Sequence, residues 1–271
     1  GDRRAMTSIT LHKHHGLGND FLVAFNPQVA DLPGFARRVC DRRRGIGADG
    51  LLVATEAEGY TAQMVLYNAD GSRAEMSGNG IRCFAQAVAM RSGSLEVQQV
   101  LTDAGRREVT LYATADPTVV NAAVDMGEVA DLSEPANWAA LACAPGRPVA
   151  HLSLGNPHSV VAVDDVGIID LIDLGTRLPE VNLEIVEVGP EDHAITMRVH
   201  ERGAGITEAC GTGACASAWA AAQWGLVPSN TSEVTVHMDG GDATVRLNSP
   251  HPGEVTLIGP ATLIATIDVT Y

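Results

Sequence analysis

Lysine is almost absent from the chain, and basic residues as a group are outnumbered by acidic ones. The sequence has 18 Lys and Arg against 33 Asp and Glu, which gives a formal net charge of −15. Such a charge repels phosphate backbones and anionic lipid surfaces, so neither nucleic acid nor membrane is an expected partner. Lys13 is the one lysine in the sequence. A mechanism that needs a lysine, such as Schiff-base formation, therefore has a single candidate.

Long apolar runs and closely paired cysteines are missing as well. No apolar run reaches the roughly 18 to 20 residues of a membrane-spanning helix, and the opening residues lack the hydrophobic core of a signal peptide. These absences predict a cytoplasmic protein. The cysteines are odd in number and contain no CxxC pair, which argues against a disulfide framework and against a zinc site. They are Cys40, Cys83, Cys143, Cys210 and Cys215.

Apolar and polar residues alternate in many short stretches, as they do in β-strands. In residues 195–199, for example, Ile195, Met197 and Val199 share one face, which is the period of two expected for a strand. Similar stretches predict strands near 51–54, 63–67, 108–113, 118–125, 151–154, 159–163, 183–188, 233–238, 242–247 and 254–258. The sequence thus predicts a strand-rich α+β fold.

Three segments have helical periodicity. The first follows Pro33 and extends to Gly45, the second lies around residues 81–89, and the third covers about 213–224. Cys83 and Cys215 lie on the apolar faces of the second and third segments. We expect both to be buried small hydrophobic residues.

The second and third predicted helices begin with the same six-residue frame. Residues 75–80 read EMSGNG and residues 208–213 read EACGTG, 133 positions later. A Gly-Asn pair followed by an apolar run precedes each frame, at 18–19 and at 155–156. Two landmarks in the same order indicate a duplicated module.

We therefore expect two pseudo-symmetric halves, each a curled, mainly antiparallel sheet around a central helix. The boundary is expected near residue 120, after the stretch around Pro117, so that the halves span 6–120 and 121–260. The last strand, within 261–271, is expected to return to the first half.

The two helix starts suit anion binding. Small residues that open a helix leave backbone N–H groups free at the positive end of the helix dipole. Neither frame has the GK[ST] of a P-loop or the GxGxxG of a dinucleotide site, so a carboxylate is favoured over a phosphate. Ser77 and Cys210 open the two frames. A cysteine at this position is expected to have its pKa lowered toward neutrality, which makes Cys210 a candidate base or nucleophile.

Three other groups of polar residues have separate interpretations. The histidines within 12–15 lack acidic or thiol partners at ligand spacing, so a solvated strand end is favoured over a metal site. The arginines at 42–44 are interpreted as a solvated helix end. Glu201 and Arg202 follow a predicted strand shortly before Cys210. This pair would suit the binding of an ammonium and a carboxylate.

Read together, these and neighbouring stretches resemble the diaminopimelate epimerases, the pyridoxal-independent enzymes of lysine and cell-wall biosynthesis. The matching stretches are GNDF (18–21), GIGADG (45–50), YNADGS (67–72), MSGNGIR (76–82), GNPH (155–158), VN (181–182) and ERG…TEACGTG (201–213). They follow the family order over most of the chain. Proline racemases share the duplicated fold, but typically have His where this chain has Asn79, and they lack YNADGS.

The resemblance implies an amino-acid epimerase whose active site lies in the cleft between the two halves. In the family one residue of a cysteine pair removes the α-proton and the other returns a proton on the opposite face. These positions are Ser77 and Cys210 here, with His158 and Glu201 assisting proton handling. The substrate-binding residues implied are Asn19, Asn68, Gly78, Asn79, Asn156, Asn182, Glu201, Arg202, Gly211 and Thr212. The implied substrate is diaminopimelate, no cofactor or metal is needed, and the family is compatible with a homodimer.

Two positions depart from the family pattern. Gly50 stands where many relatives have Gln, which removes one side chain near the substrate. Ser77 stands where the family has its first catalytic cysteine. A serine hydroxyl is a poor base near neutral pH, so we expect epimerisation to fall by about 100-fold or more.

Ser77 leaves two other functions open. A Ser/Cys pair on the same fold is also suited to the dehydration or isomerisation of another amino acid. A chain that has lost one of two required thiols is, alternatively, an amino-acid-binding protein without catalysis. Turnover of diaminopimelate, proline and hydroxyprolines, compared with binding alone, separates these functions.

Overall fold

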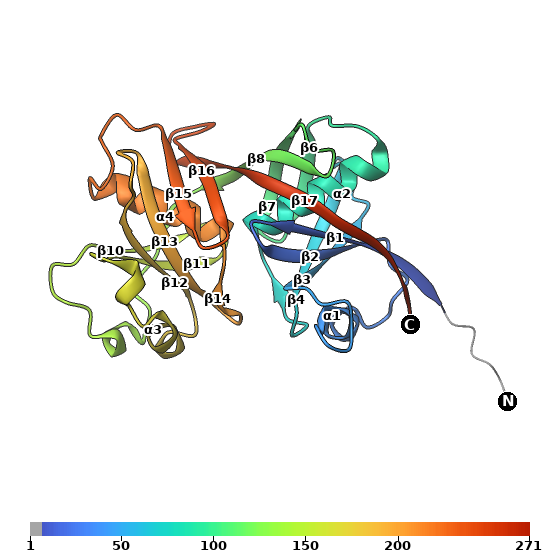
Figure 1. The fold of residues 1–271 in the computed structure, drawn as a ribbon, viewed down its shortest axis with the longest axis horizontal. Coiled ribbons are helices and arrows are strands. Elements are labelled where there is room, and N and C mark those ends of the chain that lie inside the picture. Colours follow the sequence, from blue (N-terminus) through green and yellow to red (C-terminus); the bar gives the residue numbers. More distant parts are fainter. Residues whose placement is uncertain (1–6) are drawn as a thin grey trace.

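The computed structural model describes residues 7–271, which form two lobes joined by long strands (Figure 1). The expected start of the first half, at Met6, lies outside the described residues. The first-lobe strands are β1 (Ser8–Gly16), β2 (Asn19–Phe25), β3 (Gly50–Thr55), β4 (Ala62–Asn68), β5 (Arg73–Ala74), β6 (Gln98–Thr102), β7 (Gly105–Ala113) and β8 (Val119–Glu128). The second-lobe strands are β9 (Ala130–Asp131), β10 (Val149–Ser153), β11 (Pro157–Ala162), β12 (Asn182–Val188), β13 (Ala194–Glu201), β14 (Gly205–Thr207), β15 (Glu233–Met238) and β16 (Gly241–Leu247). The last strand, β17 (Glu254–Thr270), extends from the second lobe to the first. The helices are α1 (Leu32–Cys40), α2 (Gly78–Ser92), α3 (Leu171–Arg177) and α4 (Gly211–Gln223), with short 3₁₀ turns η1 (Trp138–Leu141) and η2 (Val166–Ile168).

The two lobes repeat one strand order. In the first, β1 pairs antiparallel with β2, β2 pairs parallel with β3 across α1, and β4 pairs parallel with β6 across α2. In the second, β10 pairs antiparallel with β11, β11 pairs parallel with β12 across α3, and β13 pairs parallel with β15 across α4. The other strand pairs of the described residues are antiparallel. The predicted α+β fold, with curled sheets around a central helix, is confirmed.

Two long strands connect the lobes. The end of β17 pairs with β1, from Ser8 opposite Thr270 to His15 opposite Thr262. The beginning of β17 pairs with β8 and with β16. Figure 1 shows β8 and β17 passing together from one lobe to the other. The proposed division at residue 120 stays a prediction, since both strands contribute to both lobes.

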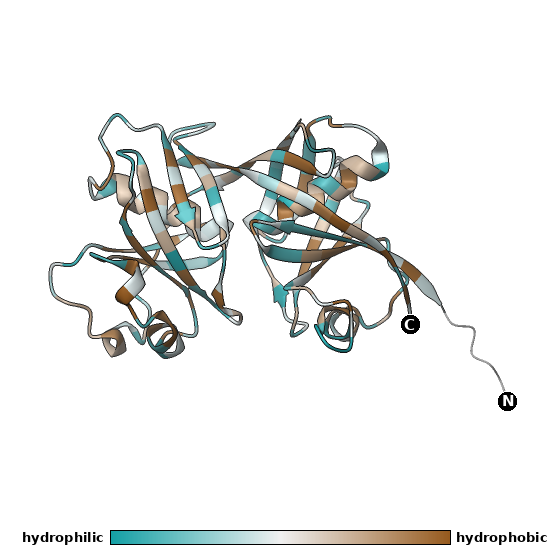
Figure 2. Cartoon of the chain, viewed as in Figure 1, coloured by the Kyte–Doolittle hydropathy of each residue, from teal (hydrophilic) through white to brown (hydrophobic). Residues whose placement is uncertain are grey.

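The central helices are buried because their sequences are apolar and small. In α4 every residue from Gly211 to Ala218 is buried, and α2 buries Ile81, Cys83 and Phe84. Figure 2 shows hydrophobic and hydrophilic residues interleaved along the surrounding strands, so that one face of each sheet packs on its helix. Cys83 and Cys215 are fully buried in this core, as expected.

Two helix predictions need correction. The first helix ends at Cys40 rather than Gly45, because Asp41 is extended and accepts the backbone N–H groups of residues 43 and 44. The helix α3 was not predicted, because it is only seven residues long and contains Gly175, which lowers helix propensity.

Candidate functional site

The starts of the two central helices touch. Ser77 is the N-cap of α2 and its Oγ accepts the Gly80 N–H at 2.9 Å, while Cys210 is the N-cap of α4 and its Sγ accepts the Gly213 N–H at 3.3 Å. A Cβ placed on Gly78 would lie 2.8 Å from the Cα of Gly211. Only glycine allows this approach of the two backbones. The residues at 77 and 210 thus flank one junction between the lobes.

A cleft of about 580 Å³ lies beside this junction and is lined by both lobes. The candidate binding and catalytic residues in its lining are Asn19, Asn68, Ser77, Asn156, Asn182, Glu201 and Arg202. The other candidates are buried and do not belong to this lining, namely Gly78, Asn79, His158, Cys210, Gly211 and Thr212. Their roles in binding and catalysis stay proposals.

A chain of polar contacts runs from Cys210 into the second lobe. Cys210 Sγ lies 3.6 Å from Thr212 Oγ1, which accepts the Asn156 amide N–H at 3.1 Å. Asn156 Oδ1 lies 3.0 Å from His158 Nε2, and His158 Nδ1 lies 2.7 Å from Glu184 Oε1. His158 and Glu184 are both buried. Sequence reasoning missed Glu184, although a glutamate in the otherwise apolar stretch 183–186 was a signal.

The prediction of a lowered pKa for Cys210 was wrong. Burial raises the pKa of this thiol well above its ordinary value, and the nearby carboxylates of Glu201 and Glu184 raise it further. Two hydrogen bonds lower the pKa of the thiol, one with the Thr212 hydroxyl and one from the Gly213 N–H at the helix start, but their effect is the smaller one. Cys210 is therefore a neutral thiol near neutral pH.

Glu201 is the most buried carboxyl group of the cleft lining. Burial raises the pKa of Glu201 to about 7, and the charge of Glu184 also raises it, whereas the hydrogen bond from Thr207 lowers it. The carboxyl group consequently changes charge near neutral pH.

Asn79 connects the two lobes beneath the cleft. Its side-chain amide donates to Asn19 Oδ1 at 3.1 Å and to the carbonyl oxygen of Ala209 at 3.0 Å. Asn19 in turn donates to Asp49 Oδ2 at 2.7 Å. Asn79, Asn19 and Asp49 thus form one network of side-chain hydrogen bonds.

Arg202 lines the cleft and contacts the first lobe. Its guanidinium lies 3.0 Å from Glu75 Oε2, an ion pair that joins the two lobes. Its backbone N–H donates to Asn182 Oδ1 at 2.8 Å. Sequence reasoning missed Glu75, although it is the first residue of the repeated frame.

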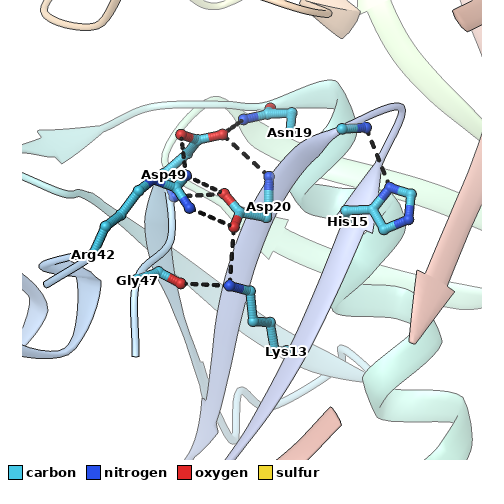
Figure 3. Close-up of polar contacts among 8 residues, drawn as sticks. Lys13, His15, Asn19, Asp20, Arg42, Gly47 and Asp49 are labelled. Atoms are coloured by element: carbon cyan, nitrogen blue, oxygen red, sulfur yellow. Dashed lines mark hydrogen bonds and ion pairs between the residues drawn. The ribbon is translucent and has the colours of Figure 1, made fainter. Parts of the chain in front are cut away.

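A charged cluster supports Asn19 from the side of the first lobe (Figure 3). Arg42 donates to Asp20 at 3.0 and 2.7 Å and to Asp49 at 3.0 Å, and Lys13 lies 3.1 Å from Asp20. The backbone N–H of Asp20 donates to Asp49, and that of Asp49 to Asp20. The interpretation of 42–44 as a solvated helix end was incomplete for Arg42, whose partly exposed guanidinium binds the buried Asp20, 22 residues earlier in the sequence.

We expect Arg42→Met to lower the free energy of unfolding at pH 7 by about 1 to 2 kcal/mol, because Asp20 is largely buried. Burial raises the pKa of Asp20, but the hydrogen bonds from Arg42 and Lys13 lower it by more. With a folded-state pKa below the unfolded value of 3.8, this stabilisation is present above pH 4 and is lost as the pH falls through the folded pKa. Urea unfolding at pH 7 and pH 3 measures both effects.

The matched control is Arg44→Met. The Arg44 side chain is 86% exposed and lies 4.0 Å from Asp41, so we expect a change within about 0.5 kcal/mol. Equal losses for the two variants would mean that the cluster does not stabilise the site.

The histidines within 12–15 do not all form a solvated strand end. His14 is fully buried, with Nδ1 2.8 Å from Gln86 Oε1, and burial lowers its pKa to about 4. The prediction failed because β1 lies between β2 and β17 and packs on α2. Within residues 7–271 no group of three or more His, Cys, Asp or Glu side chains is arranged to hold a metal ion. None of the described helices is both long and apolar enough to span a membrane.

Comparison with known proteins identifies the family. The family profile described as "Diaminopimelate epimerase" matches residues 11–131 and 151–264. The diaminopimelate epimerase of Moorella thermoacetica is 40% identical over 92% of this chain and 95% of its own length. That of Geobacillus kaustophilus is 36% identical over 96% of both chains, and that of Synechocystis is 38% identical over 94% and 96%.

Solved structures show the same fold at low sequence identity. One is a hydroxyproline epimerase of Agrobacterium vitis with bound trans-4-hydroxy-L-proline. It has a TM-score of 0.73 at 16% identity, and the match covers 98% of this chain and 92% of the epimerase. A phenazine biosynthesis protein of the PhzF family from Bacillus anthracis has a TM-score of 0.74 at 13% identity, over 97% and 99% of the two chains. These two likenesses concern the fold alone. The full-length sequence relationship, together with the paired helix starts, shows that the chain belongs to the diaminopimelate epimerase family.

Proposed function

We propose that the protein interconverts LL- and meso-diaminopimelate by proton transfer at the α-carbon, with Ser77 in place of one of the two catalytic thiols. The observation that supports this proposal is the close approach of Gly78 and Gly211 at the starts of α2 and α4, beside the cleft that Ser77 lines. Membership of the family and the curated relatives' names support the substrate.

The α-carboxylate of the substrate fits the junction of the two helices. The backbone N–H groups of residues 78, 79, 211 and 212 precede the first intrahelical hydrogen bonds, so they are available to an anion. Two helix dipoles point their positive ends at the same place. When the α-proton leaves, negative charge spreads onto this carboxylate, and fixed dipoles stabilise it in a site with little water.

Proton transfer then depends on the groups at 77 and 210. Cys210, held as a neutral thiol, is suited to deliver a proton to the carbanion. Ser77 would have to act as the base on the other face. Its hydroxyl does not ionise near neutral pH, and we propose that epimerisation is weak for this reason.

Schiff-base chemistry at a lysine is not needed for this mechanism and does not fit the described residues. The ammonium group of Lys13 lies 3.1 Å from Asp20 and donates to the carbonyl of Gly47 at 2.7 Å (Figure 3). The lysine thus stabilises the charged cluster beside Asn19. A cofactor-independent reaction is accordingly part of the proposal.

Glu201 and Arg202 are proposed to bind the charged groups of the substrate. Since the pKa of Glu201 is about 7, its carboxylate forms as the pH rises through 7, whereas the substrate ammonium keeps its charge. We expect the affinity for diaminopimelate to increase between pH 6 and pH 8. In Glu201→Gln the affinity at pH 8 is expected to be about tenfold weaker and nearly independent of pH, because one charged hydrogen bond is lost.

Isothermal titration calorimetry measures this affinity directly, since the slow turnover expected of Ser77 leaves the substrate intact. The matched control is Glu233→Gln, which removes a carboxylate from the exposed pair with Arg246. A pH-independent affinity in the unsubstituted chain would contradict the role of Glu201. His158, Glu184 and Asp49 also act on this carboxyl group and are unchanged in both variants.

Proton NMR of diaminopimelate in heavy water tests the proposed function. The chain as it stands is expected to exchange the α-proton slowly, and Ser77→Cys to exchange it fast with formation of the other stereoisomer. Turnover of proline or hydroxyproline in place of diaminopimelate would indicate a different racemase or a dehydratase. Binding of diaminopimelate with no exchange in either protein would indicate a binding protein.

Two expectations from the sequence stay predictions. Assembly into a homodimer is checked by sedimentation at several protein concentrations. The cytoplasmic location is checked by cell fractionation.

A further inference from the structure

Arg82 is a fully buried cation without an ion-pair partner in the described part of the chain. It has the largest side chain among the fully buried residues. Its guanidinium donates to Asn79 Oδ1 at 2.7 Å and to the carbonyl oxygens of Pro260 at 3.0 Å and Gly78 at 3.1 Å. Burial lowers the pKa of Arg82 to about 10, so the group is still charged at neutral pH. A buried charge with only neutral acceptors is costly, and such a cost is retained where the charge has a use.

The fold leaves room for this guanidinium on two neighbouring strands. A Cβ on Gly259 of β17 would lie 3.0 Å from Arg82 Cζ, and a Cβ on Gly16 of β1 would lie 3.0 Å from Nη2. The nearby titratable groups that act on Arg82 are the thiols of Cys83 and Cys215, and burial raises the pKa of each to about 12. Both thiols are neutral at pH 7, so neither compensates the charge.

Arg82 also determines how Asn79 faces the other lobe. Because Asn79 Oδ1 accepts from Arg82, its amide nitrogen is directed to Asn19 Oδ1 and to the carbonyl of Ala209. Ala209 immediately precedes Cys210. Loss of the arginine would free the Asn79 amide to turn, and would loosen the contact between the two helix starts.

The two helix starts therefore differ in charge, although their backbones are alike. Arg82 is five residues after the cap Ser77, and the corresponding position after Cys210 is the buried, uncharged Cys215. The start of α4 instead has the carboxyl groups of Glu184 and Glu201 nearby. The start of α2 thus has a buried guanidinium nearby, and the start of α4 has carboxyl groups nearby.

We propose that Arg82 is a positioning residue of the cleft, which orients Asn79 and stabilises negative charge at the start of α2. The anions it serves are the substrate α-carboxylate and, in a chain with cysteine at 77, the thiolate of that residue. For the substrate carboxylate this inference rests on the proposed function, whereas for the thiolate at residue 77 it does not. In Ser77→Cys the resting base is thus the thiolate at 77 and the resting acid is Cys210.

The test compares Arg82→Met, Arg82→Gln and Arg82→Lys, each combined with Ser77→Cys. The rate at which iodoacetamide alkylates residue 77 is measured from pH 5.5 to 10 by peptide mass spectrometry, which separates it from the other cysteines. Removal of the charge is expected to slow alkylation at pH 7 about tenfold and to move its midpoint to higher pH. Arg82→Lys is expected to retain the rate within about twofold.

Folding is monitored by circular dichroism, and the control is Arg147→Met with Ser77→Cys. Arg147 is a partly buried arginine that donates to the carbonyl of Ala162, outside the cleft lining. Arg82→Gln, which retains polar groups, replaces Arg82→Met if the latter does not fold. An unchanged pH profile in a folded neutral variant would overturn the proposal.

Epimerisation is measured on the same proteins so that the two proposals are separable. A drop in kcat/KM of about tenfold in the neutral variants, restored by Arg82→Lys, is expected. If Ser77→Cys does not epimerise while its alkylation follows the charge at position 82, the proposed function fails and the role of Arg82 stands. If epimerisation is fast but independent of position 82, the role of Arg82 fails alone.

Discussion

Replacing Ser77 by cysteine is expected to raise the rate of diaminopimelate epimerisation by about 100-fold or more. Ser77 and Cys210 have nearly the same backbone conformation, with φ and ψ of −143° and 122° against −131° and 114°. Each side chain accepts a hydrogen bond from the N–H three residues later. A thiol at 77 would therefore take the place that Cys210 occupies in the other lobe, with a pKa matched far better to proton abstraction.

The measurement is the initial rate of LL to meso conversion, followed by NMR in water. Ser92→Cys is the matched control, because it makes the same substitution at the opposite end of α2. We expect the rate of this control to equal that of the unsubstituted chain. A Ser77→Cys protein that folds, binds diaminopimelate and shows no gain in rate would contradict the pairing of residues 77 and 210.

Replacing Cys210 by alanine in the Ser77→Cys protein is expected to lower epimerisation by about 1,000-fold or more. The variant has no acid on the side of α4, and both directions of the reaction need one group on each face of the α-carbon. Because Cys210 is buried, the cost in stability is expected to be about 1 kcal/mol, small compared with the loss in rate. The readout is solvent deuterium at the α-carbon of the isomerised product.

Cys143→Ala is the control for this substitution. Cys143 is partly buried in the second lobe and is absent from the cleft lining, so the rate is expected to be unchanged. Diaminopimelate binding by Cys210→Ala, measured by calorimetry, should be retained within severalfold. Epimerisation that continues at the original rate without Cys210 would mean that another residue supplies the proton.

Local sequence patterns were sufficient for the elements that bear the site. The repeated frames at 75–80 and 208–213 predicted the two helix starts, because capping residues and glycines act through neighbours close in sequence. Alternation predicted most strands for the same reason. The short helix α3 was missed because its seven residues are too few for periodicity to be distinguished.

Long-range contacts were not predictable in the same way. His14 is buried only because β17 pairs beside it, more than 240 residues later in the sequence. Arg42 lies in the crossover connection between β2 and β3, and contacts Asp20 on β2 and Asp49 just before β3. Such contacts depend on the tertiary arrangement, which local sequence patterns do not predict.

The electrostatics of the cleft were the least predictable part. A helix start alone lowers the pKa of a cysteine, and this argument suggested a reactive Cys210. Burial and the carboxyl groups of Glu201 on β13 and Glu184 on β12 raise the pKa of Cys210 instead. The direction of a pKa shift follows from the sum of the contributions of the helix start, burial and nearby charges. Burial and the nearby charges are known only from the folded structure.

A crystal structure of the chain with bound diaminopimelate tests the central claim most directly, since Ser77 should preserve the complex. The account predicts one α-carbon between Ser77 Oγ and Cys210 Sγ, on opposite faces and about 3.5 Å from each, with its carboxylate on the N–H groups of both helix starts. A substrate bound elsewhere in the cleft, or with both side chains on the same face of that carbon, would contradict it.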